Sequence, residues 1–360
     1  MALSANDSFC LRNNSLAGTS SSSETEMRLS DRELVVLTFE ALLALLGVIG
    51  NISVVIVISR LRKKKQPVDC YVQNLAIADL GILLIAFPLV IIRIAMPSTW
   101  PFGRFACLYF YPVVEIFYGV SVWCIAVIAI ERYQRIVSMK IIGQKSRNKT
   151  SLQRAKTIAA GVWVTSFLIF CLPLYFFIDY VHLPGVGTFC DLFKWEKSLA
   201  TGYMVCLTLL TYLLPLAVIS FTYISISRVL KRSSHFVIRM KVVNLVAMSQ
   251  VDRRVYLTHA KSARLRQNSR AKKILSPLVL TFAVTMLPLN AFRLTMLFWP
   301  AFSEKEYYIP LLNSVVVSTI INSAANPVIY SAVSRDFRKG IANLLHHDLC
   351  QWHCKMAGTP

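Results

Sequence analysis

The chain has 360 residues, of which 55% are hydrophobic and only 16% are charged. This composition is too apolar for a soluble protein and indicates a membrane protein. The formal net charge of +21 would suit a nucleic-acid-binding protein only if the basic residues lay on a polar domain with its own core, and the sequence has no such domain. We therefore expect no nucleic-acid partner and interpret the charge by its position along the chain.

Seven hydrophobic runs are each long enough to cross a bilayer as a helix, which takes about 20 mostly apolar residues. We expect an all-α membrane protein, in which a seven-transmembrane helix bundle spans residues 34–333, after a polar N-terminal tail over residues 1–33 and before a C-terminal segment over residues 334–360. The seven helices are expected at about residues 34–60, 69–94, 104–136, 154–178, 198–230, 270–299 and 307–332.

Lys and Arg are distributed unevenly between the segments outside these helices. Of the 39 such residues, 30 fall in residues 60–65, 132–156, 228–273 and 335–360. Because cytoplasmic loops carry the excess of Lys and Arg, we expect the N-terminus to be extracellular and the C-terminus cytoplasmic. With this topology, Asn6 and Asn13 are the sequons that are open to glycosylation.

Besides Cys10 in the N-terminal tail, two cysteines lie on the predicted outer side of the membrane, Cys107 at the start of the third helix and Cys190 in the loop after the fourth. That space is oxidising, so a disulfide between them is expected, and it would fix the loop to the top of the helix. Two free thiols remain the alternative.

One acid, Asp79, lies inside the second hydrophobic run. On the lipid-facing side nothing would offset the desolvation of this carboxylate, so we expect it to face the interior of the bundle. Polar residues of otherwise apolar helices are its candidate partners, and they are Asn51, Ser121, Asn322, Ser323 and Asn326. A purely structural hydrogen-bond network is one interpretation of this cluster.

Each of the seven predicted helices carries an element of one recurring pattern. In chain order the elements are Gly50-Asn51, "NLAIADL" with Asp79, Cys107 with "ERY" (Glu131, Arg132 and Tyr133), Trp163 with Pro173, Pro215 with Tyr223, Phe282 with Pro288, and "NPVIY" from Asn326 to Tyr330, which includes Pro327. In this order and at this spacing, the set resembles the rhodopsin-like (class A) G-protein-coupled receptors, and the pattern is most similar to that of neuropeptide receptors.

The resemblance implies a plasma-membrane receptor that is not an enzyme and activates heterotrimeric G proteins when the sixth helix moves outward; arrestin and a receptor kinase are further expected partners. It implies that Asp79 and its polar neighbours hold a sodium ion, which would be the one metal of the protein. It also implies that Pro215, Val122 and Phe282 relay motion below the pocket, and that Tyr223 and Tyr330 meet on activation.

The sixth helix departs from the family pattern. Where the family has tryptophan two residues before the proline, this chain has Met286, whose side chain is softer and more flexible. At the cytoplasmic end of the same helix, Asn268 occupies the position where some relatives have an acid that clasps the arginine of "ERY". We expect Glu131 to pair with its neighbour Arg132 in the resting state, and we expect ligand-free signalling to be measurable because no second acid restrains Arg132.

Charged, polar and aromatic residues in the outer halves of the helices form the predicted ligand pocket. They are Arg93, Glu115, Tyr118, Met286, Asn290, Arg293 and Asn313. Arginine at the pocket mouth suits a carboxylate, and the acids of the outer loops suit a basic ligand. The alternative is that these charges merely mark the membrane interface.

The loop that contains Cys190 is similar to the hairpin of peptide receptors, and a strand there would offer an edge to an extended peptide. We expect a neuropeptide ligand. A small amine or lipid ligand is the alternative, although Val114 stands where amine receptors of the family have aspartate. A transporter is a remote alternative, because the sequence shows neither repeated halves nor broken helices.

The segment after the seventh helix has an amphipathic pattern, with Phe337 and Ile341 on its apolar face. We expect a short amphipathic cytoplasmic helix 8 on the membrane lipids. Cys350 and Cys354 follow as candidate palmitoylation sites. The alternatives are unmodified thiols and, because of the nearby histidines, a zinc site.

Overall fold

The computed structural model describes residues 31–61, 66–96, 99–142, 148–185, 187–191, 197–246, 276–299, 301–302, 305–333 and 337–342. The predicted glycosylation sites Asn6 and Asn13, the predicted palmitoylation sites Cys350 and Cys354, and the departure from the family at Asn268 lie outside these ranges.

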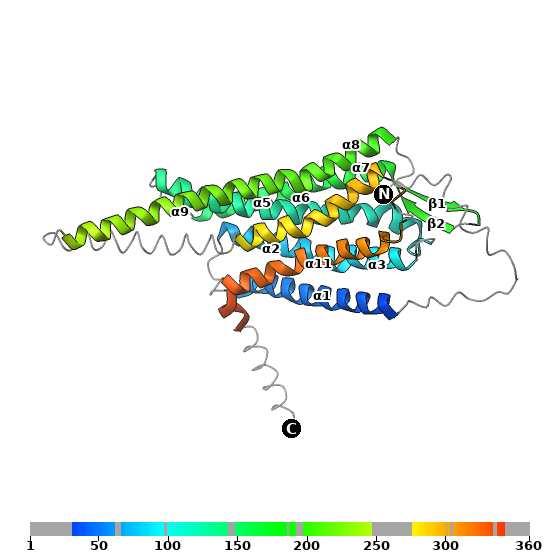
Figure 1. Cartoon of the computed structure of the whole chain (residues 1–360), viewed down its shortest axis with the longest axis horizontal. Coiled ribbons are helices and arrows are strands. Elements are labelled where there is room, and N and C mark those ends of the chain that lie inside the picture. Colours follow the sequence, from blue (N-terminus) through cyan, green and yellow to red (C-terminus); the bar gives the residue numbers. More distant parts are fainter. Residues whose placement is uncertain are drawn as a thin grey trace, which may run out of the picture.

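Seven helices in the described ranges are long and apolar enough to cross a membrane. These spans are Leu34–Arg60, Pro67–Ala95, Gly103–Ile136, Leu152–Phe177, Thr201–Lys231, Ser276–Phe298 and Tyr308–Ala332. Figure 1 shows them side by side in one elongated bundle. The predicted seven-helix fold is therefore confirmed, and the chain is a multi-pass membrane protein.

Most spans are built from α-helices interrupted by single π-helical turns. The α-helices include α1 (Asp31–Ile56), α2 (Pro67–Gly81), α3 (Phe87–Ala95), α4 (Gly103–Phe105), α5 (Tyr111–Ile142), α6 (Asn148–Ser166), α7 (Leu172–Phe177), α8 (Lys197–Thr208), α9 (Leu214–Val246) and α11 (Tyr308–Val333). The sixth span, Ser276–Phe298, is also α-helical. The π-helical turns are η1 (Val57–Leu61), η2 (Ile82–Ala86), η3 (Ala106–Phe110), η4 (Phe167–Cys171) and η5 (Leu209–Leu213).

Four of the π-helical turns share a cause. The turns η2, η3, η4 and η5 each end two residues before a proline. These prolines are Pro88, Pro112, Pro173 and Pro215. The residue just before each proline donates its backbone N–H to the carbonyl five residues earlier, as Phe87 does to Ile82. Because a proline ring clashes with the carbonyl of the preceding turn, the helix widens there instead of breaking.

The core runs along the axis of the bundle, where small and aliphatic residues of several helices meet. Leu75, Val120 and Ile219 are completely buried in it. The outward-facing surface is also apolar, since side chains such as Leu46 (66% exposed) and Phe176 (67% exposed) cover it. A surface of this kind is stable next to lipid, whereas in water it would be an aggregation hazard.

A two-stranded antiparallel hairpin lies at the end of the bundle where α1 begins (Figure 1). Its strands are β1 (Asp179–Leu183) and β2 (Gly187–Asp191). Cys190 of β2 forms a disulfide with Cys107 of η3, with an S–S distance of 2.04 Å, as the sequence predicted. The hairpin is therefore tied to the third span.

A short helix over residues 337–342 follows the seventh span at the opposite end of the bundle (Figure 1). Phe337 is buried, and a Cβ added to Gly340 would lie 2.7 Å from Val57 Cγ1, so this helix packs closely against the end of the first span. Arg338 donates hydrogen bonds to the carbonyls of Ser331 and Ala332, which are among the last carbonyls of α11. Such a contact satisfies carbonyls that the helix leaves unpaired.

Candidate functional site

An ion pair joins the third and sixth spans in the half of the bundle nearer the hairpin. Arg293 Nη2 donates to both carboxylate oxygens of Glu115, at 2.9 and 3.1 Å. The two side chains are only 12% and 20% exposed, respectively. Because the pair is partly withdrawn from solvent, its attraction is stronger than that of a surface pair. The sequence predicted both residues as pocket residues but did not predict that they would bind each other.

Two tyrosines accompany this ion pair. The phenol groups of Tyr118 and Tyr203 lie close enough to the Arg293 guanidinium to interact with it electrostatically. The Tyr203 hydroxyl also donates a 2.6 Å hydrogen bond to the carbonyl of Phe170, which connects α8 to η4. The result is a polar cluster, formed by Glu115, Arg293, Tyr118 and Tyr203, among otherwise apolar helices. Tyr203 was not predicted, because an isolated tyrosine near a helix end carries no distinctive sequence signal.

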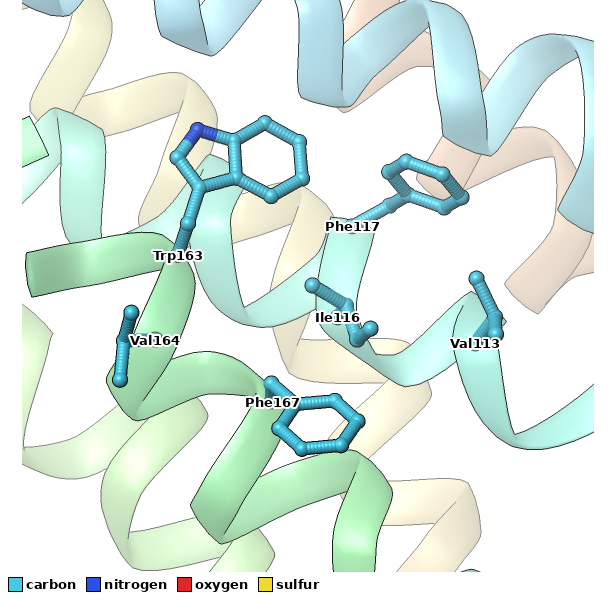
Figure 2. A pocket seen from close by; sticks show the side chains of 6 residues that line it. All are labelled: Val113, Ile116, Phe117, Trp163, Val164 and Phe167. Atoms are coloured by element: carbon cyan, nitrogen blue, oxygen red, sulfur yellow. The ribbon is translucent and has the colours of Figure 1, made fainter. Parts of the chain in front are cut away.

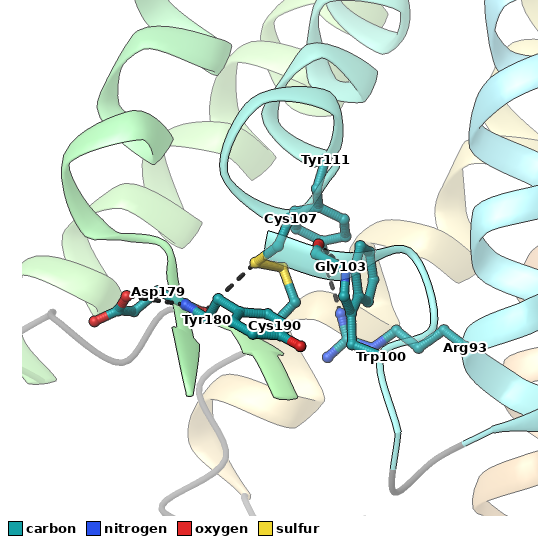
Figure 3. Close-up of a disulfide and its surroundings, with 8 residues drawn as sticks. All are labelled: Arg93, Trp100, Gly103, Cys107, Tyr111, Asp179, Tyr180 and Cys190. Atoms are coloured by element: carbon teal, nitrogen blue, oxygen red, sulfur yellow. Dashed lines mark hydrogen bonds between the residues drawn. A yellow bond between two sulfur atoms is a disulfide. The ribbon is translucent and has the colours of Figure 1, made fainter. Parts of the chain in front are cut away.

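Arg93 lies beside the disulfide and binds Tyr111, not the cluster around Arg293. Its Nη1 donates to the Tyr111 hydroxyl at 3.2 Å, and its guanidinium carbon lies 5.8 Å from the centre of the Tyr111 ring. Trp100 packs edge-on against the same ring and donates from its backbone N–H to the carbonyl of Thr188 in β2. Figure 3 shows Arg93, Trp100 and Tyr111 grouped beside the disulfide.

The sixth-span residues predicted for the pocket lie at different depths. Met286 and Asn290 are each only 2% exposed. The Asn290 amide donates to the carbonyl of Met286, and the Thr211 hydroxyl donates to Asn290 Oδ1 at 3.4 Å. Both residues are therefore packed inside the bundle below Arg293, whereas Asn313 on α11 is half-buried. A role in ligand binding for these three residues stays a prediction.

Pro215, Val122 and Phe282, the residues predicted to relay motion, are all buried, and Val122 and Phe282 are completely so. Val122, Phe282 and Met286 belong to one hydrophobic cluster. Tyr212 packs against Phe282 with ring centres 6.2 Å apart and donates its hydroxyl to the carbonyl of Ala283 at 3.1 Å. The fifth and sixth spans are thus joined at the level of the relay.

Asp79 is completely buried, and residues of two other helices bind its carboxylate. The Ser121 hydroxyl of α5 donates to Oδ1 at 2.8 Å, and the Asn326 amide of α11 donates to Oδ2 at 2.7 Å. The prediction that Asp79 faces the interior fits this geometry, since two charge-assisted hydrogen bonds offset part of its desolvation. Asp79 therefore connects the second, third and seventh spans.

Asn51 and Asn322 of the predicted Asp79 cluster make other contacts, whereas the Ser323 side chain lies close to the Asp79 carboxylate. Asn51 donates its amide to the carbonyls of Gly47 and Ser323, while Asn51 Oδ1 and the Ser323 hydroxyl are buried without a hydrogen-bond partner among the described residues. Asn322 Oδ1 accepts a 3.0 Å hydrogen bond from Thr285 of the sixth span. This contact between the sixth and seventh spans was not predicted.

The opposite end of the third span carries the "ERY" sequence. Glu131 Oε1 accepts from Arg135 Nε at 2.7 Å, and Arg135 also reaches Gln66 Oε1 at 3.5 Å. Arg132 was the predicted partner of Glu131, and the contact with Arg135 was not predicted. The Tyr133 ring lies 6.2 Å from that of Phe221.

The two tyrosines predicted to meet on activation lie on α9 and α11. Tyr223 is half-buried, and Tyr330 is 7% exposed. The Tyr330 hydroxyl is buried and has no hydrogen-bond partner among the described residues. Contact between Tyr223 and Tyr330 therefore remains a prediction about another state of the molecule.

A cavity of about 330 Å³ lies between α5 and the segment formed by α6 and η4. Figure 2 shows its lining residues, which are Val113, Ile116, Phe117, Trp163, Val164 and Phe167. All are apolar or aromatic, and Val164 is 57% exposed on the outer surface of the bundle. The cavity therefore opens on the lipid-facing surface at Val164, and none of the predicted pocket residues lines it.

Comparison with known proteins connects this geometry to one family. Residues 50–330 match the family described as "7 transmembrane receptor (rhodopsin family)". The matched range includes Asp79, the ion pair of Glu115 and Arg293, and the "NPVIY" sequence.

Individual relatives are more distant but cover most of the chain. The somatostatin receptor type 2 of Sus scrofa is 28% identical over 337 residues, covering 92% of this chain and 83% of the relative. The neuromedin-U receptor 2 of Rattus norvegicus is 29% identical over 338 residues, covering 90% and 78%. The neuropeptide Y receptor type 6 of Mus musculus is 25% identical over 329 residues, covering 88% and 82%.

Proposed function

The chain belongs to the rhodopsin family of seven-transmembrane receptors, and from this premise we propose that it is a plasma-membrane receptor for an extracellular neuropeptide. The N-terminus and the hairpin would face the outside, in agreement with the excess of Lys and Arg in the segments at the other end. Relatives named as receptors for somatostatin, neuromedin-U and neuropeptide Y support a peptide as the ligand.

The observation that supports this proposal most strongly is the partly buried ion pair of Glu115 and Arg293 below a hairpin that a disulfide holds in place. A ligand that reaches this depth meets a guanidinium and a carboxylate, both of which are common complements of peptide termini and charged side chains. The half-buried strands of the hairpin offer backbone groups at the entrance. A ligand with peptide backbone and at least one charge suits both features.

Signal transfer to the cytoplasm would pass through the sixth span. This span is bound to η5 at Ala283 and Asn290 and to α11 through Thr285, so a displacement near Arg293 would be transmitted along the span. Its cytoplasmic end would swing outward and admit a heterotrimeric G protein next to Arg132. Arrestin and a receptor kinase would use the same cytoplasmic face. Energetically the ligand acts by binding the open state more tightly than the closed one.

The Asp79 cluster would hold a sodium ion in the resting state. The side chains fit this ion, because a carboxylate is accompanied by two buried oxygens, Asn51 Oδ1 and Ser323 Oγ, that have no hydrogen-bond partner among the described residues. Such oxygen donors suit a hard cation. When bound, sodium would neutralise Asp79 and favour the arrangement in which α2, α5 and α11 are held together.

Two covalent modifications complete the proposal. Sugars would be attached at Asn6 and Asn13 on the outer side, and palmitoyl chains at Cys350 and Cys354 on the inner side. The second of these is supported by the short helix over residues 337–342, which ends near the bundle and would run along the inner leaflet. Acylation would add a second membrane contact beyond this helix.

The test is a screen of cells that express the full chain against a library of neuropeptides, with several second-messenger readouts. We expect at least one peptide to give a saturable response. With that peptide, Arg293→Glu should reduce potency by roughly 10-fold or more, because it removes a charge-assisted contact worth about 1.5–3 kcal/mol.

Arg104→Glu is the matched control, since Arg104 is an exposed arginine at the start of the same bundle half. It should leave the potency within about twofold of the unmodified receptor. A response to amines or lipids and to no peptide would contradict the proposed ligand class.

A further inference from the structure

The ion pair of Glu115 and Arg293 has a mechanical consequence beyond the recognition of a ligand. Glu115 belongs to α5, and Arg293 belongs to the sixth span. A single guanidinium nitrogen, Nη2, contacts both carboxylate oxygens, so neither oxygen is left without an interaction. The pair therefore connects two helices directly.

Glu115 lies on a helix that is held in place by other contacts. The start of the third span is attached to the hairpin through the disulfide of Cys107 and Cys190. Four residues after Glu115, the absence of a side chain at Gly119 allows Phe170 of η4 to approach so closely that an added Cβ would lie 2.3 Å from the Phe170 ring. Covalent and packing contacts thus hold α5 on both sides of Glu115.

Arg293 lies on the sixth span, which is the helix that moves in the proposed function. The sixth span carries Met286 in place of the bulky aromatic residue of its family, and Met286 packs into the core with three flexible side-chain bonds. A thioether transmits a push from a ligand less rigidly than a ring does. An ion pair, in contrast, has two discrete arrangements, formed and broken.

Any charged ligand group that binds here competes for atoms that the pair already uses. A carboxylate that binds Arg293 must displace Glu115, and an ammonium or guanidinium group that binds Glu115 must displace Arg293. Binding is therefore linked to the loss of the connection between α5 and the sixth span, which makes the two events thermodynamically coupled.

We infer that the Glu115–Arg293 pair is an electrostatic latch that holds the outer part of the sixth span against α5 in the resting receptor, and that the ligand's charged group opens it. The inference rests on the proposed function, since it requires a charged ligand group and movement of the sixth span. It gives this receptor its main resting restraint on the outer side of the membrane.

The latch is tested without any ligand, by measuring basal G-protein activation in cells that express the full chain, at matched amounts of receptor on the cell surface. Glu115→Gln keeps the size of the side chain and removes its charge. We expect basal activation to rise roughly three- to tenfold, which corresponds to about 0.7–1.4 kcal/mol because each 1.4 kcal/mol changes a population ratio tenfold.

The charge-swapped variant Glu115→Arg with Arg293→Glu shows whether the two residues act as a pair. Each single change should raise basal activation, and the double change should return it to within about twofold of the unmodified receptor. Arg104→Gln, which removes an exposed arginine from the outer part of the third span, should leave it unchanged. The swap also keeps the test valid if one single variant fails to reach the cell surface.

Unchanged or lower basal activation in Glu115→Gln at normal surface expression would overturn the latch. So would single variants that both raise basal activation when the charge-swapped double variant does not restore it. Neither result depends on the peptide screen. A receptor that answers no peptide but shows the rise and the rescue keeps the latch and loses the peptide ligand. A receptor that answers a peptide but shows neither loses only the latch.

Discussion

Asp79 accepts hydrogen bonds from Ser121 and Asn326 while Asn51 Oδ1 and Ser323 Oγ remain buried without partners among the described residues. If sodium binds there, it stabilises the folded receptor by mass action, by about 1.4 kcal/mol at ten times its dissociation constant. We therefore predict that sodium raises the thermal unfolding midpoint of the purified receptor by about 2 °C relative to a bulky organic cation. Asp79→Asn should abolish this difference.

Glu40→Gln is the matched control for that measurement. Glu40 is also an acid buried in a membrane span, only 1% exposed, but it lies on α1 outside the Asp79 cluster. The sodium-dependent difference should persist in this variant. A difference that persists equally in Asp79→Asn would show that sodium acts elsewhere on the protein.

For single residues, the sequence predicted contacts of groups that are costly to bury without a partner. It did not predict hydrogen bonds between neutral groups. Asp79 had to find partners, because an uncompensated carboxylate in a membrane is expensive. The hydrogen bond between Thr285 and Asn322 joins two neutral groups, each of which had other ways to be satisfied. The contact of Glu131 with Arg135 follows from helix geometry, since residues four apart lie on one face and adjacent residues do not.

Close packing between helices gives a prediction at the scale of single elements. Alanine at Gly119 would bring its Cβ to 2.3 Å from Phe170 Cδ2 and 2.9 Å from Ser166 Oγ, so α5 and η4 would have to separate. We expect Gly119→Ala to destabilise the receptor by about 1–3 kcal/mol, measured as a lower thermal unfolding midpoint of the purified protein.

Gly161→Ala supplies the comparison, because Gly161 lies in α6 and an added Cβ there would meet nothing within 4 Å. Alanine is the better helix former, so this variant should be as stable as the unmodified receptor or more so. Equal losses of stability in both variants would mean that the contact with Phe170 is not what requires glycine at position 119.

The elements themselves were largely predictable from the sequence. Hydrophobic length gave the seven spans, and two cysteines in oxidising space gave the disulfide that holds the hairpin. The π-helical turns were not predicted. Proline in a helix indicates a disturbance, but whether the chain kinks, breaks or widens depends on the neighbouring helices, and Pro112, which follows η3, had not been singled out at all.

At the scale of the whole molecule, charge and hydrophobicity fix the architecture, while the ligand site depends on details that one sequence does not contain. Glu115 and Arg293 are 178 residues apart in the chain, and only the packing of two helices shows that they meet. Through this packing, two predicted pocket residues connect α5, which is held in place, to the sixth span, which is proposed to move. Because the pair restrains the resting state, it would lower ligand-free signalling, which stays a prediction.

The central claim is that binding outside changes the state of the cytoplasmic face. It is tested most directly with the purified chain in lipid nanodiscs, by measuring nucleotide exchange on purified heterotrimeric G proteins with and without the peptide found in the screen. We predict that the peptide accelerates exchange on at least one heterotrimer, and that Arg132→Ala removes the acceleration while peptide binding remains. A peptide that binds the nanodisc receptor but changes the exchange rate on none of the heterotrimer classes would contradict the account.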